Sequence, residues 1–125
     1  MGLFFIGIGG GMDNNLMALN SEFVLKLNGI EYNAAKVILK TGAGTTGAIT
    51  FEQSIDGVNY GGTAIKYSIN NGSQTSALTG ILPTTTAGAV YAVEVPCGGA
   101  KFLRARVTTA LTNPLASFDI SPFNS

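Results

Sequence analysis

The sequence predicts an all-β protein, a single antiparallel β-sandwich of jelly-roll or immunoglobulin-like type. Three observations predict this class. Apolar residues recur at every second position in seven segments, which is the period of a strand with one face on a core and one in water. Gly, Asn, Asp and Pro mark turns between these segments. No window of 11 or more residues sustains the apolar spacing of an amphipathic helix.

The first four segments alternate core-facing apolar residues with polar or charged ones. They are residues 22–28, 34–40, 47–55 and 64–70. The side chains expected to face the core are Phe23, Leu25, Leu27, Ala35, Val37, Leu39, Ile49, Phe51, Ile55, Ile65, Tyr67 and Ile69. Each segment is therefore predicted to be a half-buried strand.

Three further strands are predicted at 90–95, 101–108 and 115–121. Their expected core-facing residues are Tyr91, Val93, Val95, Leu103, Ala105, Val107, Phe118 and Ile120. Turn signals lie at 28–29, 42–47, 56–57, 61–62, 71–72, 97–99 and 113–114, so we expect hairpins or loops there. The longest irregular stretch, 79–89, contains a proline and three consecutive threonines. It is predicted to cross from one sheet to the other.

A chain of 125 residues is the length of one domain. We assign residues 14–125 to the sandwich and residues 1–13 to an apolar, glycine-rich N-terminal arm or extra strand. The apolar residues of this segment are Leu3, Phe4, Phe5, Ile6 and Ile8. Three roles remain open for it: a strand of the same sandwich, an arm on another subunit, or a membrane-active segment. No Lys or Arg precedes the run, and it is far shorter than the ~20 residues of a bilayer span, so neither signal peptide nor membrane anchor is predicted.

Composition argues against several classes of function. Seven Lys and Arg balance seven Asp and Glu, which provides no basic surplus for binding nucleic acid. Histidine, the commonest acid–base catalyst near neutral pH, is absent.

The single Cys97 follows a predicted strand, and the nearest cation in the sequence is Lys101. Without a base to lower its pKa we expect a structural thiol.

Other chemical signals each have a simpler structural explanation. Glu52 and Glu94 could form an acid–base pair, or could lie separately on solvated strand faces. The stretch 56–59 is similar to part of a calcium loop, but the full pattern needs more oxygen ligands and a closing Glu, and an Asp-Gly hairpin turn explains it. Tyr60 could stack on a sugar, or pack at a strand edge. We therefore predict no catalytic, cofactor-binding or metal-binding residue and no cofactor.

Arg104 and Arg106 face the same side of a predicted strand, ~7 Å apart. Two guanidinium groups at this spacing can bind carboxylates of a partner protein. They can equally form ion pairs within the chain or remain solvated. Both alternatives are open from the sequence.

Residues 47–60 form a strand that runs into the pattern S-x-D-G-x-N-aromatic. Together with 90–95 and 101–108, this stretch resembles small β-sandwich proteins from the structural modules of tailed bacteriophages, and the resemblance covers about 47–121. It implies a non-enzymatic virion protein, made in the host cytoplasm, most specifically a capsid decoration (cement) protein. A tail or baseplate component and a carbohydrate-binding module are the alternatives.

The implied partners are the major capsid protein or other virion proteins, within a homo-oligomer for which the resemblance favours a trimer. A glycan is a possible ligand, and neither nucleic acid nor membrane is expected. The residues that we expect at a protein interface are Leu3, Phe4, Phe5, Ile6, Ile8, Arg104 and Arg106.

Overall fold

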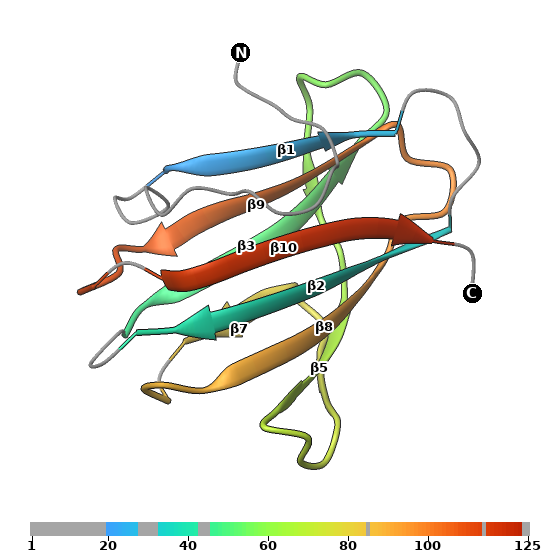
Figure 1. Cartoon of the computed structure of the whole chain (residues 1–125). Coiled ribbons are helices and arrows are strands. Elements are labelled where there is room, and N and C mark those ends of the chain that lie inside the picture. The colour runs from blue at the N-terminus through green and yellow to red at the C-terminus, as the bar shows by residue number, and fades with distance from the viewer. Residues whose placement is uncertain (1–19, 28–32, 43–45, 85, 114, 124–125) are drawn as a thin grey trace.

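The computed structural model describes residues 20–27, 33–42, 46–84, 86–113 and 115–123. These ranges contain ten strands and no helix, which confirms the all-β prediction (Figure 1). The strands are β1 (Glu22–Lys26), β2 (Ala34–Thr41), β3 (Ala48–Ser54), β4 (Gly61–Gly62), β5 (Ile65–Ile69), β6 (Thr75–Ala77), β7 (Ile81–Pro83), β8 (Val90–Pro96), β9 (Phe102–Thr109) and β10 (Leu115–Phe123). Within the described ranges, no helix is long and apolar enough to span a membrane.

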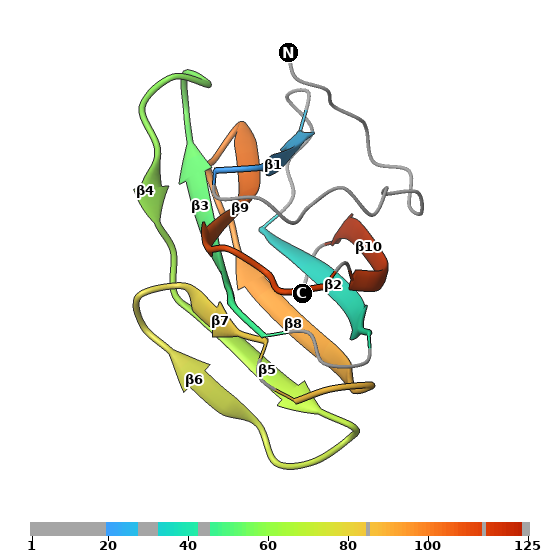
Figure 2. The same ribbon diagram turned by 90° about the vertical axis from the view of Figure 1, so that its left-hand side faces the viewer.

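The strands form two antiparallel sheets packed face to face. The first sheet has the order β1-β9-β3-β4, and β7 also pairs with β3. The second sheet has the order β10-β2-β8-β5-β6. In Figure 2 the edges formed by β4, β7 and β6 lie on one side of the molecule, and those formed by β1 and β10 lie on the other. The predicted antiparallel sandwich is therefore confirmed.

The pairing pattern is that of a jelly roll. Strand β1 pairs with β9, β2 with β8, β3 with β7 and β5 with β6, so the pairs are nested one inside the next. A long hairpin that rolls up into two sheets produces this nesting. The short strand β4 and the long strand β10, which extends the second sheet beyond β2, are additions to the eight nested strands.

Most connections in a jelly roll lead from one sheet to the other. Among the predicted turns, 56–57 joins the hairpin of β3 and β4, and 71–72 lies in the hairpin of β5 and β6. The turns at 42–47, 97–99 and 113–114 instead join strands of opposite sheets. The stretch 79–89 changes sheets as predicted, but it contains β7, which the sequence analysis missed along with β4 and β6.

The turn that follows β5 shows how asparagine can take the place of glycine. Asn70 and Asn71 both have positive φ, 52° and 62°, and the Gly72 amide donates to the Ile69 carbonyl at 2.9 Å. These features are typical of a type I′ turn, which here begins the longer connection from β5 to β6. The central pair is thus one residue earlier than the Asn-Gly pair marked by the sequence.

The core contains nearly all the side chains that the alternation placed there, including Leu25, Val37, Phe51 and Tyr91. Tyr67 and Ile69 are only partly buried and pack against this core. The prediction for Ile55 is wrong, because β3 ends at Ser54 and Ile55 is 69% exposed in the loop that follows. Residues 1–13, including the predicted interface residues Leu3, Phe4, Phe5, Ile6 and Ile8, lie outside the described residues, and their role stays a prediction.

Candidate functional site

The predicted arginine pair surrounds one carboxylate on the outer face of the first sheet. Arg104 and Arg106 lie on β9, and Glu52 lies opposite Arg104 on the neighbouring strand β3. Glu52 Oε1 accepts hydrogen bonds from Nε of Arg104 at 2.8 Å and from Nε of Arg106 at 3.1 Å. Glu52 Oε2 accepts from Nη2 of Arg106 at 2.9 Å. Each arginine therefore forms a charge-assisted contact with the same, largely buried carboxylate.

Three further groups complete the cluster. Arg104 Nη1 donates to Glu22 Oε1 at 3.2 Å, and Arg106 Nη1 donates to Asn20 Oδ1 at 3.0 Å. The guanidinium carbon of Arg104 lies 3.8 Å from the centre of the Tyr60 ring, which is a cation–π contact. The structure thus shows intramolecular ion pairs for Arg104 and Arg106. Arg104 covers one face of Tyr60, the residue for which sugar stacking and packing at a strand edge were the alternatives.

The electrostatics of this cluster favour the ionised form of Glu52. Burial raises the pKa of Glu52, but hydrogen bonds from Arg106 and Arg104 outweigh this effect, so the pKa lies below its usual value. The hydrogen bond to Glu52 raises the pKa of Arg106. Since the pKa of Glu52 is lowered by folding, its ionisation stabilises the fold above the ordinary glutamate pKa, and this contribution is lost as the pH falls through the lowered pKa.

We expect Glu52→Gln to reduce the free energy of unfolding by ~1–3 kcal/mol at pH 7, because both guanidinium groups lose the carboxylate that they share. The loss should shrink when both proteins are unfolded by urea below about pH 4, where the unfolded-state carboxylate of the parent is protonated. A loss that stays constant from pH 7 to pH 3 would contradict this assignment.

Asp56 holds the β3–β4 loop together. Its Oδ1 accepts from the amides of Val58 and Asn59, both at 2.8 Å, and from Ser54 Oγ at 2.9 Å. Its Oδ2 accepts from Asn59 Nδ2 at 2.8 Å, and Ser54 Oγ accepts from the Gly57 amide at 2.9 Å. The backbone hydrogen bonds, followed by those from the side chains, lower the pKa of Asp56 far below its usual value. These contacts correspond to the hairpin alternative for 56–59.

Glu52 and Glu94, the carboxylates that could have formed an acid–base pair, lie on different sheets. Glu52 lies on the outer face of the first sheet, whereas Glu94 lies on β8 in the second sheet. No group of three or more Asp, Glu or Cys residues in the described part of the chain has the spacing needed to hold a metal ion.

Cys97 is fully buried at the end of β8. Its amide donates to the Asn33 carbonyl, and its own carbonyl accepts from the Ala100 amide. Burial raises the pKa of the thiol, which disfavours the reactive thiolate.

We expect Cys97 in the native protein to react with a disulfide reagent such as dithionitrobenzoate at least ~10³-fold more slowly than in urea, because the core must open first. Free cysteine, measured in both solvents, corrects for the effect of urea on the reagent. Rapid reaction in the native state would show that the thiol is accessible.

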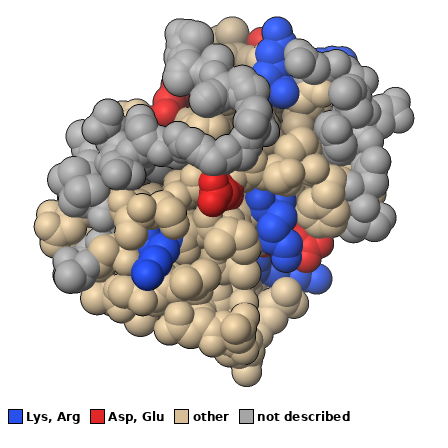
Figure 3. Space-filling model, viewed as in Figure 1, with Lys and Arg blue, Asp and Glu red and all other residues tan. Residues whose placement is uncertain are grey.

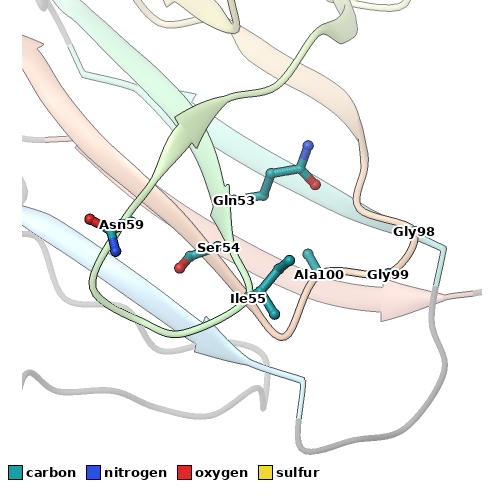
Figure 4. Close-up of a pocket in the computed structure, with 7 residues that line it drawn as sticks. All are labelled: Gln53, Ser54, Ile55, Asn59, Gly98, Gly99 and Ala100. Carbon is teal, nitrogen blue, oxygen red and sulfur yellow. The ribbon is translucent and has the colours of Figure 1, made fainter.

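A pocket of about 490 Å³ opens at one end of the sandwich (Figure 4). Its walls are the end of β3, the β3–β4 loop and the loop between β8 and β9. The lining residues are Gln53, Ser54, Ile55, Asn59, Gly98, Gly99 and Ala100. The volume is in the range of small-molecule sites.

None of these residues was predicted from the sequence as a binding site, and Gln53 is the one that a sequence signal could have indicated. It continues the core-facing positions Ile49 and Phe51 on β3, so a carboxamide follows two buried apolar side chains at the point where the sheet ends. A polar residue in a core-facing position is the signal that could have identified it. Ile55, wrongly predicted to lie in the core, belongs to the wall of the same pocket.

Comparison with known proteins finds no matching family model, no matching curated protein and no matching solved structure.

Proposed function

We propose that this protein is a non-enzymatic structural component of a virus particle, specifically a capsid decoration protein that binds the major capsid protein as an oligomer. The observation that carries the proposal is the nested jelly-roll pairing of the strands. Jelly rolls are a recurrent architecture of viral capsid domains, and also of lectins. The fold supports the proposal by analogy, since one fold can serve many functions.

The surface of the second sheet also supports repeated assembly. Glu94 on β8 lies between Lys36 on β2 and Lys66 on β5, so opposite charges face each other across the strands. Ile38 and Val90 are exposed apolar residues on β2 and β8. Figure 3 shows a few side chains of both signs on a described surface that is mostly uncharged. With a net charge of zero, many copies can gather without mutual repulsion.

The predicted interface residues extend this proposal to particular contacts. We propose that Leu3, Phe4, Phe5, Ile6 and Ile8 dock on a neighbouring subunit or on the capsid, within a trimer. Arg104 and Arg106 retain some exposure, with 20% and 28% of their side chains accessible. A carboxylate of a partner protein would therefore have to compete with Glu52 for hydrogen bonds from these two arginines.

Locating the chain in intact particles tests the proposal. Gold-labelled antibodies against the purified protein would be applied to particles from cells that make it, and label spread over the capsid shell is expected. Label confined to the tail would contradict a decoration protein and favour a tail or baseplate component. Particles that contain none of the chain would contradict a virion role.

Light scattering on the purified protein tests the oligomer separately. The expected mass is that of three 12.8 kDa chains. A stable monomer at high concentration would contradict the trimer without bearing on the location of the chain.

A further inference from the structure

We propose that the pocket at the end of the sandwich binds a neutral saccharide unit. The polar side chains in its lining are those of Gln53, Ser54 and Asn59, and the backbone of Gly98 and Gly99 adds further hydrogen-bonding groups. Ile55 provides an apolar wall. This binding site is independent of any role in a virus particle.

The side-chain carboxamide of Gln53 is available to bind a ligand. Its carboxamide makes no hydrogen bond to any other described residue, although the side chain is partly buried. Figure 4 shows it reaching from β3 into the space beside the segment 98–100. A carboxamide both donates and accepts hydrogen bonds, as a sugar hydroxyl does. A bound hydroxyl would therefore satisfy both functions of Gln53.

The loops around the pocket are held in place by their own hydrogen bonds. Asp56 fixes the β3–β4 loop, and the Lys101 amide donates to the Ser54 carbonyl at 2.9 Å, joining the two walls. The walls are therefore already ordered before a ligand binds, and this reduces the entropic cost of binding. At Gly99 a β-carbon would meet nothing within 4 Å, so a ligand has room to approach the backbone.

The lining favours a neutral ligand because none of its side chains is charged. The nearby Asp56 carboxylate already accepts hydrogen bonds on both oxygens. Asn59 uses its Nδ2 to hold Asp56 at the edge of the pocket, so the Gln53 carboxamide is the side-chain group available to a ligand hydroxyl. Ile55 is exposed at the rim and can contact the C–H face of a sugar ring.

An extended peptide fits this site less well. Peptides commonly bind by adding a strand to an unpaired sheet edge. At the pocket, the backbone of Gln53 is already paired on both sides, with Gly61 of β4 and Leu103 of β9. The pocket therefore offers side-chain amides and loop backbone, which suit scattered hydroxyl groups better than a regular peptide backbone.

The test uses the full-length, ¹⁵N-labelled protein titrated with neutral oligosaccharides of glucose, galactose, mannose and N-acetylglucosamine. We expect at least one of them to shift the amide resonances of 98–100 in a saturable way. No shift with any of the four series would overturn the proposal. Binding only of uronic-acid or sialylated oligosaccharides, or only of a peptide panel, would also overturn it.

A pair of matched variants tests the role of Gln53. Gln53→Met keeps the size of the side chain and removes its hydrogen bonds, and it should weaken binding about tenfold, which is ~1.4 kcal/mol. Gln74→Met makes the same change at an exposed position just before β6 and should bind as the parent does. Thermal unfolding of both variants checks that they fold. Equal affinity of folded Gln53→Met and the parent would overturn the assignment.

Discussion

Gly80→Ala is expected to lower the free energy of unfolding by ~2–5 kcal/mol. Gly80 has a φ of +77°, where a residue with a β-carbon costs ~1–2 kcal/mol. Its β-carbon would clash with the Thr63 carbonyl oxygen and lie 2.8 Å from the Phe51 carbonyl oxygen, and relieving such overpacking costs a further ~1–3 kcal/mol.

The backbone around Gly80 has little freedom to move away. The Phe51 amide donates to the Gly80 carbonyl at 2.9 Å, and the Gly80 amide donates to the Ala77 carbonyl at 3.1 Å. The Thr63 amide in turn donates to the Phe51 carbonyl at 3.1 Å. Three segments therefore meet at this glycine, and shifting any one of them breaks a hydrogen bond of another.

Gly88→Ala is the matched control. Gly88 also has positive φ, +63°, but a β-carbon there would meet nothing within 4 Å. The free energy of unfolding of this variant should fall only by the ~1–2 kcal/mol that positive φ costs a residue with a β-carbon. Urea unfolding of both variants measures the difference. Equal losses for the two variants would show that close contact at Gly80 contributes nothing.

In the proposed role on a capsid, removal of residues 1–13 is expected to leave the isolated domain folded and to weaken its binding to the particle greatly. Burial of the five large apolar side chains can contribute ~8–15 kcal/mol at ~1.5–3 kcal/mol each. Ordering a dozen residues costs a similar amount at ~1–2 kcal/mol per residue. One arm is therefore marginal, but an oligomer that presents several linked arms gains effective concentration for each later contact.

A chain beginning at Asn14 and a full-length Phe4→Ser, Phe5→Ser variant would be compared with the parent. Both should keep the melting temperature of the parent and dissociate sooner from particles. Unchanged particle binding would contradict the arm. If the segment is instead a strand of the same sandwich, both changes will lower the melting temperature. If it is membrane-active, they will abolish binding to lipid vesicles.

The sequence by itself determined the class of fold and most of the core. Alternation at period two depends only on strand geometry, so the inward positions such as Val37, Leu39 and Val93 could be identified without any knowledge of pairing. The single failure in β3 arose because alternation does not indicate where a strand ends. Ile55 continues the period, yet it lies beyond the last residue of the strand.

The arginine–glutamate cluster and the pocket are formed by residues that lie far apart in the sequence, so only the tertiary structure could bring them together. Glu52 meets Arg104 across 52 residues of sequence, and Glu22 meets Arg104 across 82. Gln53 became part of a pocket only because the 98–100 segment lies beside the β3–β4 loop. The sequence could therefore indicate that these side chains point outwards or inwards, but not which residues they would face.

The order of the strands was also decided by tertiary structure. A turn of Gly, Asn or Asp satisfies the same local dihedral angles whether the chain returns to its neighbour or crosses to the opposite sheet. The choice between these paths depends on which arrangement buries the apolar faces of both sheets at once, and that is a property of all the strands together. Local signals therefore predicted a sandwich, whereas the nested pairing of the jelly roll came from packing of the whole chain.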